Sequence, residues 1–153
     1  MEEKSMGFFS RLFGHDAHDE EKMANIRRSI RSEIDIAECI EAHMKWKGRL
    51  QSYLDGTSRE QLDPMVICRD DQCVLGKWIH GPALNYFHDD EGFHKLRSDH
   101  ANFHFVAGSV VKKVQERDLA GSDALLKNEY ARASRDVIQD LAELNKHLHR
   151  QDQ

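Results

Sequence analysis

Proline and glycine are scarce in this sequence, with two of the first and nine of the second among 153 residues. Proteins built from many strands and tight turns need both, so this scarcity, together with a charged fraction of 32%, favours a helical protein. Long apolar runs are missing too, and the longest falls far short of the roughly 20 residues that a membrane-spanning helix needs. We therefore expect one helical domain without a transmembrane segment, because the chain is too short for two domains of ordinary size.

Cysteine is rare as well, and an odd number of three without a signal peptide argues against a disulfide framework. A reducing compartment is the better expectation. Positive charge is in deficit, since 22 Lys and Arg face 27 Asp and Glu and give a formal net charge of −5. This balance argues against nucleic acid, or an anionic membrane surface, as a general partner.

The order of apolar and polar residues divides the chain into a leader and one domain. We expect a flexible leader at residues 1–20, whose Phe-rich segment either packs loosely or docks on a partner, and a helical domain at residues 21–150. Within the domain, apolar residues recur at threes and fours, which is typical of amphipathic helices. Long helices are predicted at residues 21–54, 90–118 and 123–149.

Short polar segments are predicted to mark where these helices begin. Gly121-Ser122-Asp123 should break the chain and cap the last helix. Ser58 and Gln61 fit a capping box in the connection that follows residue 54, although Pro64 keeps any helix there short.

The stretch from Asp70 to Trp78 carries the most informative chemistry. Asp70 and Asp71 are placed to cap a short helix with Cys73 in its first turn, where free backbone N–H groups and the helix dipole favour a thiolate. An alternative role for Asp70 is to interact with the ligands of a metal site, without binding the metal itself, and so to orient or polarise them. Gly76 permits close backbone approach, and Trp78 offers a large apolar ring that can anchor the helix.

Histidines supply the other candidate ligands. His100 and His104 stand four apart in a predicted helix, so both rings project from one face, a spacing that suits a single metal ion. His43 lies on or beside the apolar stripe of the first helix and is a further candidate. With Cys73 these residues form a four-ligand set that zinc accepts as a tetrahedron. Ten histidines in a short chain create decoys, so spacing alone leaves the set open.

Three neighbours of these residues are not expected to be ligands. His80 lies seven residues after Cys73, about 10 Å away along a helix, which is too far for one ion. Cys39 is expected to be a half-buried thiol without a metal role. Cys68 has the wrong spacing for a ligand and is at most a resolving thiol for an oxidised Cys73. Phe103 is expected to flank the His pair without sharing its direction.

The segment Cys73-Val74-Leu75-Gly76-Lys77-Trp78 resembles the Cys-Xaa-Leu-Gly-Xaa-Trp signature of the chemoreceptor zinc-binding (CZB) domain family. An earlier His and a later His-x-x-x-His pair also match that family, and the resemblance covers roughly residues 25–150. It implies zinc as cofactor with the ligands His43, Cys73, His100 and His104. It also implies an all-α fold, a four-helix bundle with an additional short helix that carries the Cys.

The resemblance implies a cytoplasmic zinc-dependent sensor of bacterial signalling, in chemotaxis or in cyclic-di-GMP systems. A homodimer is expected. Because no effector domain accompanies the motif, we expect a standalone form that acts on a separate partner, a chemoreceptor or a diguanylate cyclase system. The signal is either zinc availability or oxidation of the zinc-bound Cys73. The alternative is a structural interaction module that zinc merely stabilises.

An enzyme is not expected. Four protein ligands close the zinc shell and leave no position for a catalytic water. Oxygen-activating di-metal bundles need several Glu-x-x-His motifs, and the corresponding carboxylates are absent around His100 and His104.

Overall fold

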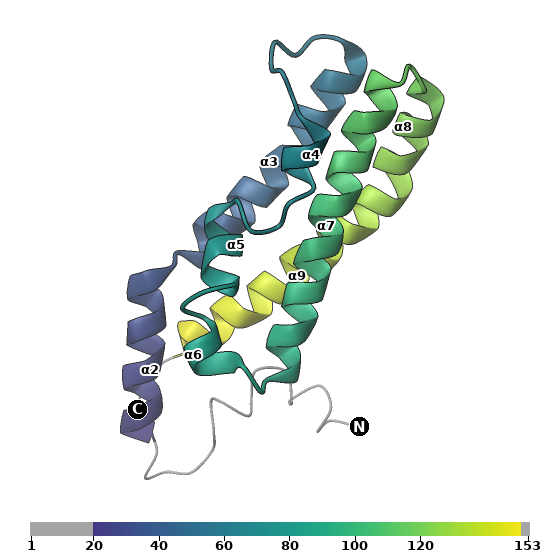
Figure 1. The fold of residues 1–153 in the computed structure, drawn as a ribbon. Coiled ribbons are helices and arrows are strands. Elements are labelled where there is room, and N and C mark those ends of the chain that lie inside the picture. Colours follow the sequence, from purple (N-terminus) through teal and green to yellow (C-terminus); the bar gives the residue numbers. More distant parts are fainter. Residues whose placement is uncertain (1–19, 151–153) are drawn as a thin grey trace.

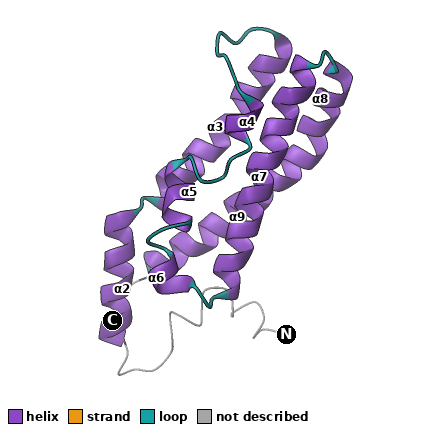
Figure 2. Ribbon diagram, viewed as in Figure 1, coloured by secondary structure: helices purple, strands orange, loops and turns teal. Residues whose placement is uncertain are grey.

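Helices make up all the regular structure in residues 20–150, the part of the chain that the computed structural model describes (Figures 1 and 2). They are α2 (Glu20–Glu33), α3 (Ile36–Asp55), α4 (Pro64–Ile67), α5 (Val74–Ile79), α6 (Leu84–Phe87), α7 (Glu91–Gln115), α8 (Leu119–Leu125), the π-helix η2 (Leu126–Tyr130) and α9 (Ala131–Leu148). The predicted all-α class is confirmed. The leader predicted at residues 1–20 lies outside the described residues, apart from Glu20, at which α2 begins. None of the described helices is long and apolar enough to cross a membrane.

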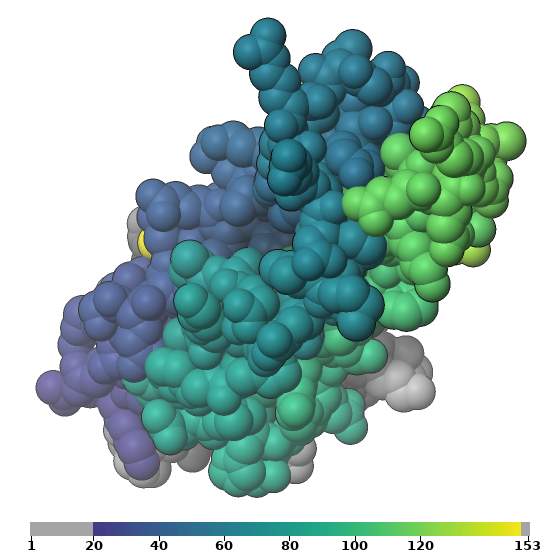
Figure 3. All heavy atoms as spheres, turned by 45° about the horizontal axis from the view of Figure 1, so that its top comes forward, coloured from purple at the N-terminus to yellow at the C-terminus, as the bar shows by residue number. Residues whose placement is uncertain are grey.

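The long helices form a bundle. Helices α3, α7 and α9 pack against one another, while α2 packs against α9 at one end (Figure 1). Because α8, η2 and α9 follow one another without a break, they act as one long helix, and with α2, α3 and α7 they make up the predicted four-helix bundle. The short helices α4, α5 and α6 lie in the connection between α3 and α7, which covers the face seen in Figure 3.

The single helix predicted over residues 21–54 is in fact two helices. The chain opens between Ile34 and Asp35, and Asp35 takes an extended backbone conformation (φ −103°, ψ 99°) as the N-cap of α3. Its side chain accepts a hydrogen bond from the backbone N–H of Glu38 at 3.1 Å. Ile34 and Ile36 on either side are both buried. The apolar pattern therefore continues across the break and does not reveal it.

The predicted break at Gly121-Ser122-Asp123 is wrong, because these residues lie inside α8. The chain turns earlier, at Arg117, which has a left-handed backbone (φ 67°). Asp118 then caps α8 by accepting a hydrogen bond from the backbone N–H of Gly121 at 2.9 Å. Ser122 is buried and donates to the Val110 carbonyl at 3.0 Å, so it ties α8 to α7. A better cap three residues upstream overrides the local turn signal.

The predicted capping box at Ser58 is also wrong, since the following residues form no helix. The short helix α4 begins at Pro64 instead, with Asp63 as its N-cap accepting from the backbone N–H of Met65 at 2.9 Å. Helix α4 lies tightly on α7 at Gly108, where an added Cβ would come within 3.0 Å of both the Pro64 carbonyl oxygen and the Cys68 Cβ. This close packing brings the end of α4 to the middle of α7.

The core extends through the whole bundle. Large side chains from α3, α5, α6, α7 and α9 are almost completely buried in it; among them are Leu50, Leu75, Trp78, Phe87, Phe93, Leu96, Phe103, Val137, Leu141 and Leu144. The buried polar residues include three imidazoles, which lie close together midway along α3 and α7. An apolar core of this extent isolates those imidazoles from water.

Candidate metal centre

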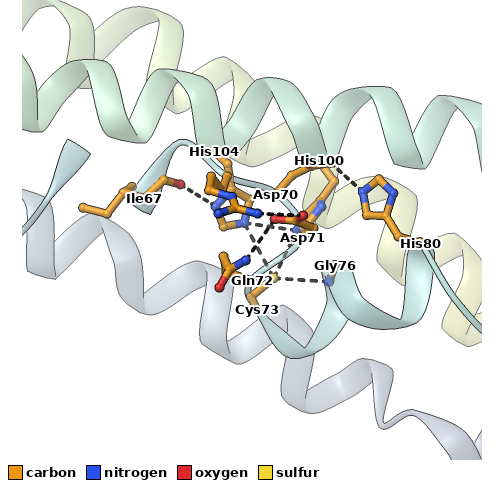
Figure 4. A network of polar contacts seen from close by, with 10 residues as sticks. Ile67, Asp70, Asp71, Gln72, Cys73, Gly76, His80, His100 and His104 are labelled. Atoms are coloured by element: carbon orange, nitrogen blue, oxygen red, sulfur yellow. Dashed lines mark hydrogen bonds and ion pairs between the residues drawn. The ribbon is translucent and has the colours of Figure 1, made fainter. Parts of the chain in front are cut away.

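Four potential ligands from three elements meet at one point in the bundle. His43 comes from α3, His100 and His104 from α7, and Cys73 from the residue before α5. Each offers one ligand atom, and the four atoms all lie within 4.8 Å of one another. All four residues that the sequence predicted as ligands are thus brought together. Figure 4 shows Cys73 facing the rings of His100 and His104.

The distances between ligand atoms suit a single small ion. Cys73 Sγ lies 3.4 Å from His100 Nε2 and 3.6 Å from His104 Nε2, and the two nitrogens are 3.2 Å apart. Zn–S and Zn–N bonds of about 2.3 and 2.0 Å place the corners of a tetrahedron about 3.3 to 3.6 Å apart. The three separations among Cys73, His100 and His104 agree with this geometry, and the His43 ligand atom lies within 4.8 Å of each of them.

Cys73 is positioned by the start of α5, although not in the way predicted. Instead of lying in the first turn behind an Asp cap, Cys73 is itself the N-cap, with an extended backbone (φ −82°, ψ 166°). Its Sγ accepts a hydrogen bond from the backbone N–H of Gly76 at 3.3 Å. Burial raises the pKa of the Cys73 thiol, and backbone N–H groups such as that of Gly76 lower it in part. A bound cation would supply the charge that the thiolate needs.

Backbone carbonyls orient two of the imidazoles. The Nδ1 atom of His43 lies 2.7 Å from the Cys39 carbonyl oxygen, and that of His104 lies 2.9 Å from the Ile67 carbonyl oxygen. Each Nδ1 therefore carries the proton and donates it, which leaves the Nε2 lone pair facing the other ligands. His43 Nε2 is buried and has no hydrogen-bond partner. A buried lone pair without a donor is costly in a metal-free site and is what a metal ion would satisfy.

Burial keeps the histidines neutral. His100 is completely buried, and His43 and His104 are 3% and 4% exposed. Burial, and then the neighbouring His104 and His43, lower the pKa of His100 to about 2. The pKa values of His43 and His104 are lowered as well, chiefly by burial. The neutral imidazole is the form that binds a metal ion.

Phe103 belongs to the site, contrary to the prediction. It is completely buried, and its ring meets those of His43 and His104 edge-on at centroid distances of 5.1 and 5.4 Å. The Phe103 ring also packs against the ring of Tyr130, at a centroid distance of 5.4 Å. It therefore lies between the imidazoles and the rest of the core. Sequence reasoning missed it because α7 is buried over more of its circumference than a two-sided helix would be.

The residues predicted to be decoys lie outside the cluster. His80 pairs with Asp70 at 3.0 Å between Nε2 and Oδ2 (Figure 4), so Asp70 neither caps α5 nor bonds a ligand imidazole directly. Cys68 Sγ donates to the Met65 carbonyl at 3.4 Å. Cys39 is 5% exposed, so it is more deeply buried than the half-buried thiol predicted.

Comparison with known proteins identifies the domain. A family model described as "Chemoreceptor zinc-binding domain" matches residues 43–111. This chain carries a chemoreceptor zinc-binding domain. The match begins at His43 and includes the other three clustered residues, so the family to which the sequence motif pointed is confirmed. No curated protein and no solved structure gives a significant match.

Chemoreceptor zinc-binding domains bind zinc and work with chemoreceptors or other signalling proteins, and the cluster in this chain is able to hold a metal ion. The match spans α4 to α6, most of α3 and most of α7. Helices α2, α8 and α9 lie outside it. Helices α8 and α9 pack on α3 and α7, and α2 packs on α9, so all three belong to the same bundle.

Proposed function

We propose that His43, Cys73, His100 and His104 hold one zinc ion and that the chain is a zinc-dependent sensor in bacterial signalling. The convergence of four ligand atoms within 4.8 Å, with His43 Nε2 buried and unpartnered, supports this proposal most directly. Four protein ligands complete a tetrahedral zinc shell and leave no position for a reactive water. The ligand set therefore favours a binding and sensing role over a hydrolytic one.

The contrast between Cys73 and the histidines supports sensing rather than a purely structural role. The three histidines lie on the long helices α3 and α7, which pack on each other and on α9. Cys73 follows a run of turns and bends at residues 68–72 and begins a helix of six residues. Because α3, α7 and α9 also pack directly on one another, we propose that Cys73 and α5 change position while these three helices stay packed.

Two inputs act on the same ligand. Zinc occupancy draws Cys73 toward α3 and α7, so metal binding shifts the position of α5. Oxidation of the Cys73 thiolate removes the negative charge that makes sulfur a strong ligand and releases the same segment. Either input changes the surface near Val74, which is 72% exposed, and we propose that a separate signalling protein, or a second copy of this chain, responds to that change.

The test compares zinc content and local stability in matched variants. Cys73→Ala should lose zinc as measured by elemental analysis, whereas Cys68→Ala should keep it, because Cys68 Sγ bonds only the Met65 carbonyl. Chelating the zinc should then increase hydrogen exchange in residues 68–79 and leave α3, α7 and α9 protected. Full zinc occupancy in Cys73→Ala would disprove the ligand set. Unfolding of the whole bundle on chelation would favour the structural module instead.

A further inference from the structure

Cys39 and Cys73 line the same cavity. This cavity of about 420 Å³ lies between the first half of α3 and the start of α5, and it is also lined by Asp35, His43 and Val74. Cys39 stands four residues before His43, so the two side chains are neighbours on one face of α3. The ligand atoms of His43 and Cys73 lie within 4.8 Å of each other. The Cys39 side chain is therefore one turn of α3 away from the place where His43 and Cys73 meet.

We propose that Cys39 is the resolving thiol of the zinc site, so that oxidation of Cys73 by a peroxide leads to an intramolecular Cys39–Cys73 disulfide and to loss of zinc. This inference rests on the proposed role of Cys73 as a zinc ligand. It differs from the sequence-based expectation, which considered Cys68 for the same role.

The chemistry proceeds in two steps. The Cys73 thiolate attacks one oxygen of the peroxide, an S–O bond forms, the O–O bond breaks and hydroxide leaves, so Cys73 is oxidised to the sulfenic acid by two electrons. The Cys39 sulfur then attacks the Cys73 sulfur, the S–S bond forms, and the S–O bond breaks. The departing hydroxide takes the proton of the Cys39 thiol and leaves as water.

The environment of Cys39 fits a thiol that reacts second. Cys39 is 5% exposed, so its side chain is largely shielded from dissolved oxidant. Cys73 is partly exposed and lines a further cavity of about 460 Å³ beside Trp46 and His104. An oxidant therefore reaches Cys73 first, and Cys39 reacts by proximity.

Cys68 is placed less well for this reaction. Its Cβ packs toward Gly108 on the α7 side, its Sγ bonds the Met65 carbonyl, and it does not line the cavity that Cys39 shares with Cys73. The turns at residues 68–72 allow Cys73 to move toward α3, as a disulfide requires. Bond formation at Cys39 also acts on a second ligand, since the Cys39 carbonyl orients His43.

The experiment treats zinc-loaded protein with a molar excess of hydrogen peroxide, follows zinc release with a chromogenic chelator, and maps the products by mass spectrometry. The wild type and Cys68→Ala should release zinc, lose two hydrogen atoms in mass, and yield a peptide pair joined through Cys39 and Cys73. Dithiothreitol should restore zinc binding. Cys39→Ala should instead gain oxygen atoms on Cys73 up to the sulfinic acid, and dithiothreitol should not restore its zinc site.

Sulfinic acid on Cys73 of the wild type without a joined Cys39–Cys73 peptide would overturn the inference, as would a bridge to Cys68. If Cys39→Ala fails to fold, Cys39→Val fills the same buried position, and the peptide map of the wild type decides without any variant. Failure of the proposed function is distinguishable, because a protein without zinc before oxidation shows it in the elemental analysis.

Discussion

Gly76 lies directly against the backbone of Asp70. A Cβ added to Gly76 would overlap the Asp70 carbonyl oxygen and come within 3.1 Å of the Asp71 Cα. The turn before Cys73 therefore folds back onto the first turn of α5. That first turn of α5 also holds the backbone N–H of Gly76, which donates a hydrogen bond to Cys73 Sγ. A side chain at position 76 is incompatible with this arrangement of the Cys73 segment.

Gly76→Ala should lower both stability and zinc affinity. The added methyl group must push the Asp70 turn away, at a cost of about 1 to 3 kcal/mol in the free energy of unfolding, and it shifts Cys73 with it. Gly48→Ala is the matched control, because an added Cβ there meets nothing within 4 Å and should stabilise α3 by about 0.5 to 1 kcal/mol. Urea unfolding and zinc titration of both variants measure the effects. Equal behaviour of the two variants would contradict the packing described.

That His43, Cys73, His100 and His104 come together could be predicted because three of them carry a local sequence signal, whereas His43 is marked only by its place at the apolar stripe of its helix. His100 and His104 have the spacing of a helical metal pair, and Cys73 lies in a recognisable hexapeptide with Gly76. The close backbone approach predicted for Gly76 is confirmed. The packing of α4 on α7 brings the Ile67 carbonyl to His104 and so orients this ring. This packing depends on contacts between residues distant in the sequence, so no local signal predicts it.

Helix boundaries were predicted less well, for a physical reason. Apolar periodicity reports which face of a helix is buried, and the buried face continues through the break at Asp35. Turn residues report only a local preference. At Gly121 the N-cap at Asp118 overrides that preference. Ser122 is of a residue type common in turns, but here it is buried and its hydroxyl bonds the Val110 carbonyl.

Zinc binding should release about one proton per ion near neutral pH. The pKa of His100 is lowered to about 2 by burial and by its neighbouring histidines, and the pKa values of His43 and His104 are also lowered, so these rings bind zinc without losing a proton. The pKa of Cys73 is raised, chiefly by burial, so its thiol must lose one. Near neutral pH the affinity should therefore rise with pH, by about tenfold per unit.

Calorimetry in buffers of different ionisation enthalpy measures this proton release. In Cys73→Ala any residual binding should release none. Release of several protons at pH 6 by the wild type would show that the histidines are protonated in the metal-free protein.

Glu33 should stabilise the position of α5 through Trp78. The Trp78 indole N–H donates to Glu33 Oε1 at 3.1 Å, and the Tyr86 hydroxyl donates to Glu33 Oε2 at 2.7 Å, so one carboxylate of α2 holds both α5 and α6. Glu33→Ala leaves the buried indole N–H without this partner, at a cost of about 1 to 3 kcal/mol. Glu33→Gln keeps an acceptor and should cost less. Thermal unfolding followed by tryptophan fluorescence measures the difference. The exposed Glu41→Ala is the control, and a Glu33→Ala variant as stable as this control would contradict the role.

Asp140 should make the bundle less stable as the pH rises toward and through 7. It is 4% exposed, and burial, with a contribution from Asp99, raises its pKa to about 7, while Lys95 at 3.1 Å opposes the shift. Because the folded state holds this proton more tightly than the unfolded chain, the stabilisation is fully present below about pH 4 and is lost as the pH rises through about 7. The slope approaches about 1.4 kcal/mol per pH unit within that window. Asp140→Asn should flatten the slope in urea unfolding, whereas Asp136→Asn, one turn earlier and partly exposed, should keep it. Parallel pH profiles for the wild type and Asp140→Asn would show that the buried carboxyl at position 140 does not hold the proton.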